Sequence, residues 1–444
     1  MSIVNLMQEF ANSPSLRNGI FDLLSSVKMA NDANVKLLDY TVELFKNNGL
    51  FSDYYGYHNV DHELEVTYVT LLSGKYSLEQ NYISKTDLNY LFASALLHDF
   101  DPDKSIDKPH EKNVIHFISK DQNIQKLLAN ANLDQNLICA IISRTVYPWT
   151  GDIVTNTEKL IQDYFSNSEI KDDNERQKHF RELGHFLSIS DRIGGYSLGD
   201  FQKAMEMAKM NAHSSGWHPA FIVRRSVVFF EDMLNNEPDM CQRVLNGLPK
   251  HMRKNFLDNI VGFMKLRQEE IQIYNQFVYD GQPLVPCIQK STLSDDTLDE
   301  LLSIYRELPK PLQFTRDDFI ESIRDPETIL NMLRIGNSSG RIIGFAKGGP
   351  LEKYNFDLDF EDRNRGKNNT VFLEPVAIKN GYWGFHGGRE LRQLFMMQVE
   401  SKGYKFMTSF AMRDVIDERK ENDKNVVFVK KFNPERWDYF RVTL

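Results

Sequence analysis

Apolar residues recur at three- and four-residue spacing through most of the chain up to about residue 280. This spacing places apolar side chains on one face of an α-helix. Pro and Gly cluster between the apolar runs, as in YPWTGD and SSGWHP, and mark the connections. The pattern therefore predicts an all-α helical bundle. Its clearest helices are expected over residues 33–48, 87–100, 136–146, 221–236 and 255–280.

The pattern changes at residues 280–287, and short runs typical of β-strands alternate with helical stretches from there to the end of the chain. Helices are expected at 294–308 and 388–403. This alternation predicts an α/β unit, so we expect two domains, residues 1–283 and 284–444. The expected strands cover residues 331–335, 341–349, 369–378, 404–411 and 425–432.

Composition and charge limit the class of protein. The 444 residues include 53 Lys plus Arg and 62 Asp plus Glu, so the formal charge is -9, which disfavours nucleic-acid binding through a general basic field. No apolar run approaches the roughly 18 residues of a membrane span, and the N-terminus does not resemble a secretory signal. We expect a cytoplasmic protein with no membrane partner, and the sequence leaves its oligomeric state open.

Cysteine usage narrows the chemistry of any metal site. Cys139, Cys241 and Cys287 are the three cysteines, and none belongs to a C-x-x-C pair. A zinc-thiolate site and a disulfide framework are therefore not expected. Any metal ion would need nitrogen and oxygen ligands.

Three segments of the first domain carry such ligands. His58 and His62 lie four residues apart in YHNVDH, His98 and Asp99 end an apolar run, and Asp191 stands near the polar end of another. We expect His58 and His62 to share a helix face. Imidazole and carboxylate suit a divalent ion, and polar groups on buried helix faces need a partner or a metal. Taken singly, each histidine also fits a hydrogen-bonded core residue, and Asp191 also fits an ion pair with the next residue, Arg192.

In combination, Y-H-N-x-x-H, then H-D, then a distant helical Asp resembles the HD-domain metal-dependent phosphohydrolases over residues of roughly 40–280. The spacing looks most like the cyclic nucleotide phosphodiesterase branch. The stretch IISRTVYP is similar to the helix that follows that family's core, with Thr145 in a matching position. The resemblance implies one or two divalent ions (Zn, Mn, Fe or Mg) and a small-molecule phosphoester or nucleotide as substrate. It makes His58 the general acid, and it makes His62, His98, Asp99 and Asp191 the metal ligands.

Two departures from that family leave its substrate open. The phosphodiesterases continue as H-D-x-x-H-P-G, whereas residues 98–102 here read HDFDP. His110 is a candidate for the missing histidine, with an exposed residue at a helix start as the alternative. No residue is assignable as the family's base-selecting glutamine, so phosphoester hydrolysis is expected without a choice of cyclic nucleotide.

The second domain contains a strand over residues 370–378, a glycine-rich turn, and a helix beginning near Gly388. Such a turn lets backbone amides approach a pyrophosphate at a helix N-terminus. The order of elements from about residue 285 to 444 resembles the GNAT acyltransferase fold. That family's loop is Q/R-x-x-G-x-G/A, whereas residues 383–388 read WGFHGG, so the leading Gln/Arg and the central Gly are replaced.

The GNAT resemblance implies acetyl-CoA or CoA as a cofactor and Glu374 as the catalytic base, with the acyl acceptor and the general acid unassigned. For Glu374 the alternative is a strand carboxylate satisfied by a neighbour. The cofactor contacts that it implies are Val376, Ile378, Gly384, His386, Gly387, Gly388 and Arg389.

These observations predict a bifunctional enzyme, a metal-dependent phosphohydrolase joined to a GNAT-type acetyltransferase. An alternative keeps the hydrolase and makes the GNAT-like domain a non-catalytic CoA sensor or docking module. A third reading, a nucleotide-responsive interaction protein with two degenerate sites, fits less well because all five residues of the first site are intact.

Overall fold

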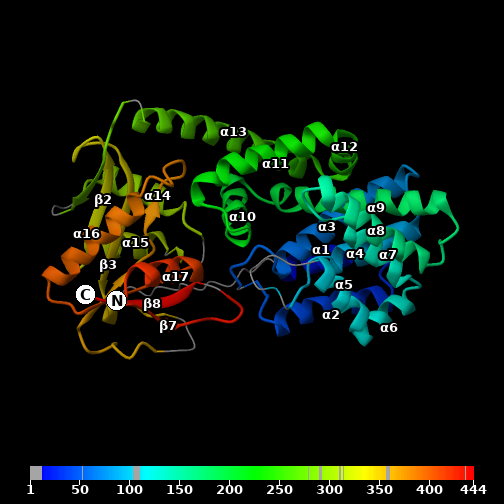
Figure 1. Ribbon diagram of the computed structural model, residues 1–444, viewed down its shortest axis with the longest axis horizontal. Helices are drawn as coiled ribbons and strands as arrows, with labels where there is room; N and C mark the ends of the chain where they lie inside the picture. Colours follow the sequence, from blue (N-terminus) through cyan, green and yellow to red (C-terminus); the bar gives the residue numbers. More distant parts are fainter. Residues whose placement is uncertain are drawn as a thin grey trace. The chain divides into compact units, whose positions relative to one another are not determined.

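The computed structural model describes residues 13–52, 54–102, 104, 111–278, 280–289, 293–309, 312–313, 315–356, 361–435 and 437–444. Its contacts divide these residues into two compact units (Figure 1). The helical unit comprises residues 13–216 and Arg225–Gly262, and the sheet unit comprises Trp217–Arg224 and Phe263–Leu444. Helix α13 (Lys250–Val278) contributes to both units, so its second half belongs with the sheet, ahead of the boundary predicted at 283/284.

The helical unit contains no strand among its described residues, as the apolar spacing predicts. Its elements are α1 (Ser13–Ser26), α2 (Asp32–Asn47), α3 (Val60–Glu79), α4 (Lys85–Leu97), α5 (Glu111–Lys120), α6 (Gln122–Asn130), α7 (Gln135–Ser143), α8 (Gly151–Ser166), α9 (Asn174–Ser197), α10 (Phe201–Ser214), α11 (Ile222–Asn236), α12 (Pro238–Gly247) and the first half of α13.

Helix α3 lies at the centre of the helical unit, because it packs against α1, α4, α9 and α12. Most of its residues are buried, including acidic ones. Helix α4 is apolar on nearly every side and begins with a capping box between Ser84 and Asp87, which satisfies its first backbone amides. Three of the packed helices, α3, α4 and α9, carry the polar residues discussed below. That these helices have the arrangement of an HD domain stays a prediction.

The sheet unit is built on one eight-stranded mixed sheet, in the order β1-β2-β3-β4-β6-β8-β7, with β5 paired to β3. Strands β4 and β6 run parallel, and the other described pairs are antiparallel. The predicted strands and helices are present, but the strand expected over residues 369–378 is divided into β4 and β5 around Pro375, which has no backbone N–H to donate. Strand β1 and helices α15 and α17 were not among the expected elements. The strands are β1 (Leu284–Ile288), β2 (Ile329–Ile335), β3 (Ile342–Pro350), β4 (Thr370–Leu373), β5 (Ala377–Ile378), β6 (Phe406–Ala411), β7 (Val426–Lys430) and β8 (Asp438–Thr443), and the helices are α14 (Asp295–Tyr305), α15 (Arg316–Arg324), α16 (Gly387–Ser401) and α17 (Arg413–Asn422).

Helices cover both faces of this sheet. On one face, α16 packs on β2 and β3 through a core that includes Leu333, Leu391 and Phe395. On the other face, Tyr305 of α14 and Phe319 of α15 stack on each other and pack against Phe345 of β3. The second half of α13 joins the first core through Ile273, so the sheet unit includes a helix that precedes it in the chain.

In the part of the chain that the structure describes, no helix has the length and apolar character needed to cross a membrane.

Candidate functional site

The start of α3 positions the first predicted ligand. The Asn59 side chain accepts hydrogen bonds from the backbone amides of Asp61 and His62, so Asn59 is the N-cap and the helix begins at Val60. His58 therefore lies before the helix, and the expectation that His58 and His62 share a helix face is wrong. The two rings are nevertheless close, with centroids 5.6 Å apart.

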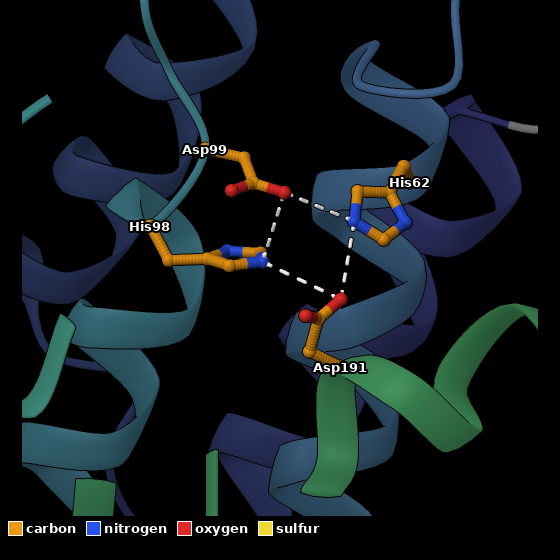
Figure 2. A group of neighbouring side chains, drawn as sticks. All are labelled: His62, His98, Asp99 and Asp191. Atoms are coloured by element: carbon orange, nitrogen blue, oxygen red, sulfur yellow. Dashed lines mark hydrogen bonds and ion pairs between the residues drawn. The ribbon is translucent and has the colours of Figure 1, made fainter. Parts of the chain in front are cut away.

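Four predicted ligands converge from three helices. His62 comes from the first turn of α3, His98 and Asp99 follow the last turn of α4, and Asp191 lies in the last two turns of α9. Figure 2 shows the two imidazoles and two carboxylates facing one another around a common centre. One ligand atom from each residue lies within 4.8 Å of the other three.

The distances within this cluster are those of direct polar contact. The Nε2 atom of His62 lies 3.1 Å from Oδ2 of Asp99 and 3.3 Å from Oδ1 of Asp191. The Nε2 atom of His98 lies 3.3 Å from Oδ2 of Asp99 and 3.8 Å from Oδ1 of Asp191. Each imidazole therefore faces both carboxylates, which is the arrangement of a site with two nitrogen and two oxygen donors.

Burial makes the electrostatics of the cluster strong. Burial lowers the pKa of His62, but hydrogen bonds with Asp191 and Asp99 outweigh it and raise the pKa to about 9. Burial likewise lowers the pKa of His98, and nearby carboxylates raise it well above its ordinary value. Burial raises the pKa of both aspartates, but the histidines hold each pKa below its ordinary value. The groups thus interact as a set, and two carboxylates this deep need positive charge between them.

A divalent cation fits this donor set. Imidazole nitrogen with carboxylate oxygen suits Zn, Mn or Fe, and Mg takes the oxygen donors. The Nε2 atom of His98 is buried and has no hydrogen-bond partner among the described residues, as expected of a donor atom directed at an ion. Arg192, the alternative partner of Asp191, instead pairs with Glu237 at 2.6 Å. The same cluster was expected from sequence, and the fold brings it together.

His58 lies at the edge of the cluster. Its Nε2 atom is 3.9 Å from Oδ2 of Asp99, and its side chain is 13% exposed, more than either histidine of the cluster. Tyr57 packs edge-on against His58 and lies beside His62. His58 is therefore close to the four donors but is not one of them. His110 lies outside the described residues.

The candidate base of the sheet unit is buried in a polar network. Glu374 is 2% exposed, and its carboxylate lies 2.5 Å from Nζ of Lys347, which is 1% exposed. The hydroxyl of Tyr354 donates to Glu374 at 2.8 Å, and Lys347 also donates to Ser322 at 2.7 Å. This is the alternative weighed from sequence, a strand carboxylate satisfied by neighbours. Its role as a base stays a prediction.

Sequence reasoning did not single out Lys347 or Tyr354. A signal for Lys347 was present, because IIGFAKGG is an apolar strand and its alternation puts Lys347 on the same face as Phe345. A lysine on a buried strand face requires an acidic partner. Glu374, which directly follows the neighbouring strand β4, is that partner.

The glycine-rich turn leads into the N-terminus of α16. His386 has φ of 60°, in the left-handed region, and is the N-cap without a side-chain hydrogen bond to the helix. A Cβ on Gly387 would lie 2.4 Å from Leu333, so close packing of α16 on β2 needs glycine there. A Cβ on Gly388 would meet nothing within 4 Å. The backbone amide of Arg389 donates to the carbonyl of His386, so it is not available to a phosphate.

The remaining predicted cofactor contacts surround this turn. Val376 and Ile378 pack against the core below α16, and the carbonyl of Ile378 accepts a hydrogen bond from Trp383 at 3.1 Å. Gly384 has φ of +86°, and a Cβ there would lie 2.6 Å from Ala220. The structure therefore gathers the predicted contacts around one turn, with the segment Trp217–Arg224 against one side of it.

No family model and no curated protein matches this chain. Similar solved structures include the ribosomal-protein-S18-alanine N-acetyltransferase from Escherichia coli, which is 13% identical at a TM-score of 0.26, covering 36% of this chain and 93% of its own. An N-acetyltransferase from Staphylococcus aureus is 16% identical at a TM-score of 0.26, covering 36% of this chain and 98% of its own. A GCN5-related N-acetyltransferase from Kribbella flavida is 11% identical at a TM-score of 0.27, covering 37% of this chain and 99% of its own.

Proposed function

We propose that the helical unit is a metal-dependent hydrolase of small phosphoesters, with nucleotides as the first substrates to test, and that it is an HD-type domain. The observation that carries this proposal is the convergence of one donor atom each from His62, His98, Asp99 and Asp191 within 4.8 Å. Two imidazole nitrogens and two carboxylate oxygens, brought together from three helices, are a donor set that binds divalent cations.

In this proposal the four clustered residues hold a divalent ion. When bound, such an ion lowers the pKa of water to near 7 and neutralises charge on a phosphoryl group. His58 donates a proton to the leaving oxygen, since it lies beside the cluster and its imidazole is partly open to a substrate. Asp99 faces the Nε2 atoms of His62 and His98 and also that of His58, so Asp99 also orients His58 as the proton donor.

Metal content and turnover test the proposal together. The purified protein is analysed for bound metal and screened against linear and cyclic nucleotides and other phosphoesters with added Mn²⁺, Mg²⁺, Zn²⁺ or Fe²⁺. Asp99→Ala should lose both the metal and the activity, because it removes the carboxylate that contacts both imidazoles. A metal-replete and fully active Asp99→Ala protein would overturn the assignment.

The role of His58 has a separate test. His58→Ala should retain the metal, and its turnover rate should fall roughly 10²- to 10⁴-fold, the usual contribution of a positioned proton donor. His251 is an exposed histidine of the same unit, and His251→Ala is the matched control that should change neither quantity. Equal loss of metal in His58→Ala and Asp99→Ala would make His58 a ligand instead.

We also propose that the sheet unit binds CoA or acetyl-CoA at the glycine-rich turn, as a GNAT-type domain would. Support comes from the parallel pair β4 and β6 within an otherwise antiparallel sheet, with the turn and α16 connecting them. The open space over Gly388 at the N-terminus of α16 supports it as well. The burial of Glu374 beside Lys347 favours the sensor alternative over a catalytic acetyltransferase.

Calorimetry with CoA and acetyl-CoA tests the second proposal. Gly388→Val should prevent binding without disturbing the fold, because its side chain would enter the open space where a pyrophosphate approaches. No binding by the unmutated protein at millimolar ligand would reject a CoA site. Binding without acetyl transfer to any amine tested would support the sensor, and transfer would support the enzyme.

A further inference from the structure

A fully buried glutamate lies behind the metal cluster. Glu63 follows His62 in the first turn of α3 and is 0% exposed. Its Oε2 atom lies 3.3 Å from Nδ1 of His98, and its Oε1 atom lies 3.5 Å from the backbone amide of Asp99. One carboxylate thus contacts both residues of the His98-Asp99 pair. The clustered donor atoms themselves do not include it.

The surroundings of His98 determine which ring nitrogen carries the proton. The Nδ1 atom faces the carbonyl of Ala95 at 2.9 Å and the carboxylate of Glu63 at 3.3 Å. Both neighbours only accept hydrogen bonds, so Nδ1 must be the donor. In the neutral ring, Nε2 then presents its lone pair to the cluster, where it lies 3.3 Å from Asp99. His98 therefore points its only free lone pair toward the proposed ion.

Ala95 and Glu63 affect the His98 ring in different ways. The backbone carbonyl of Ala95 is a neutral acceptor and is sufficient to orient the ring. Glu63 adds a negative charge in a site without solvent, where charge is weakly screened. The Oε2 atom of Glu63 has no hydrogen-bond partner among the described residues, so Glu63 acts on His98 through its charge. A carboxylate behind the far nitrogen of a ligand histidine makes the metal-facing nitrogen a stronger donor. The N-terminus of α3 and the amide of Asp99 stabilise this carboxylate while it does so.

We propose that Glu63 is a positioning residue of the metal site, which strengthens metal binding by His98 and holds the His98-Asp99 turn in register. This inference rests on the proposed metal-dependent function. It assigns to Glu63 an effect on metal affinity that is separate from proton donation by His58.

The test measures affinity for Co²⁺ in the full chain, together with stability of the metal-free protein. Glu63→Gln keeps the volume of the side chain and removes its charge. It should weaken Co²⁺ binding about 10- to 100-fold, as is usual for loss of a carboxylate behind a metal-bound histidine. The melting temperature of the metal-free protein shows how much of the effect is loss of stability, and the visible spectrum of the Co²⁺-saturated variant should change. Glu63→Asp, which keeps the charge, should recover part of the affinity.

Glu79→Gln is the matched control, because Glu79 is exposed at the other end of α3 and the substitution changes net charge equally. Co²⁺ affinity unchanged within about twofold in Glu63→Gln, or reduced equally in Glu79→Gln, would overturn the inference while leaving the metal site intact. If neither Glu63 variant folds, Glu63 serves the fold and the inference is also overturned. Absence of Co²⁺ binding by the unmutated protein would reject the proposed function and this inference together. Binding without hydrolysis of any phosphoester would reject only the function.

Discussion

Removal of one partner from the buried ion pair of the sheet unit should be strongly destabilising. Lys347→Met keeps most of the side-chain volume and removes the ammonium group that lies 2.5 Å from Glu374. The Glu374 carboxylate then keeps the Tyr354 hydroxyl but has no positive partner. Both residues are almost fully buried, so water cannot replace the lost interaction.

The expected loss in the free energy of unfolding is about 3 to 5 kcal/mol, the usual cost of leaving one buried charge unpaired. Replacing both charges, in Lys347→Met with Glu374→Gln, should cost less than the single change, because no buried charge remains. Burial raises the pKa of Glu374 even beside Lys347, and removal of the lysine should raise it further. A protein that contains a carboxylate with a raised pKa in the folded state loses stability as pH rises above the pKa of that group in the unfolded chain. The part of the defect that comes from the charge of Glu374 should therefore be absent below about pH 4.5, the ordinary value for Glu, and grow as pH rises above it.

Urea unfolding followed by tryptophan fluorescence measures this effect. Of the four tryptophans, Trp217, Trp383 and Trp437 belong to the sheet unit, so the signal reports mainly on that unit. With an m-value of about 2 kcal/mol/M, the expected loss moves the urea midpoint by about 1.5 to 2.5 M. Lys353→Met is the matched control, because the Lys353 ion pair with Asp325 is about one-third exposed and should contribute at most about 1 kcal/mol. A shift for Lys347→Met no larger than that of the control would refute the reasoning. So would a double variant less stable than the single one.

Three further predictions follow from packing and charge. Gly387→Val should lower the melting temperature, because overpacking against Leu333 costs about 1 to 3 kcal/mol, whereas Gly388→Val should leave it unchanged. Equal melting temperatures for the two variants would contradict the packing of α16 on β2. In urea unfolding, a fragment of residues 284–444 should be less stable than one of residues 263–444. The shorter fragment lacks the apolar side chains that α13 adds to the core, and each of these contributes up to about 1.5 to 3 kcal/mol. Equal urea midpoints for the two fragments would show that α13 is dispensable. Burial raises the pKa of Glu237, but its histidine and arginine partners outweigh burial and hold that pKa at about 2. The ionised carboxylate therefore stabilises the folded protein above pH 4.5, and this stability is lost as pH falls toward 2. Glu237→Gln should flatten that acid limb in melting temperatures measured between pH 2 and 5, and an unchanged limb would contradict it.

Local patterns in the sequence were enough for most of the elements and for the candidate metal-site residues, whereas the role of each residue came from the resemblance to the HD-domain phosphohydrolases. Three- and four-residue spacing predicted the helices before residue 280, and alternation predicted the strands after it, because each periodicity reflects which face of an element is buried. His62, His98, Asp99 and Asp191 stood out because ionisable residues are costly on apolar helices unless they bind something. That reasoning needs no knowledge of which helix packs on which.

Only the tertiary structure decided which groups meet. The capping side chain of Asn59 starts α3 at Val60, so His58 approaches the cluster from the preceding loop rather than from the helix. Glu63 became relevant only when α3 and α4 packed together and brought its carboxylate to the far side of the His98 ring. Likewise, the sequence singled out Glu374 as a candidate base, and only the packing of β3 beside the end of β4 shows that Lys347 is its charged partner. Periodicity along a chain reports burial of a residue, whereas the partner of a buried charge comes from another segment, and only packing brings the two segments together.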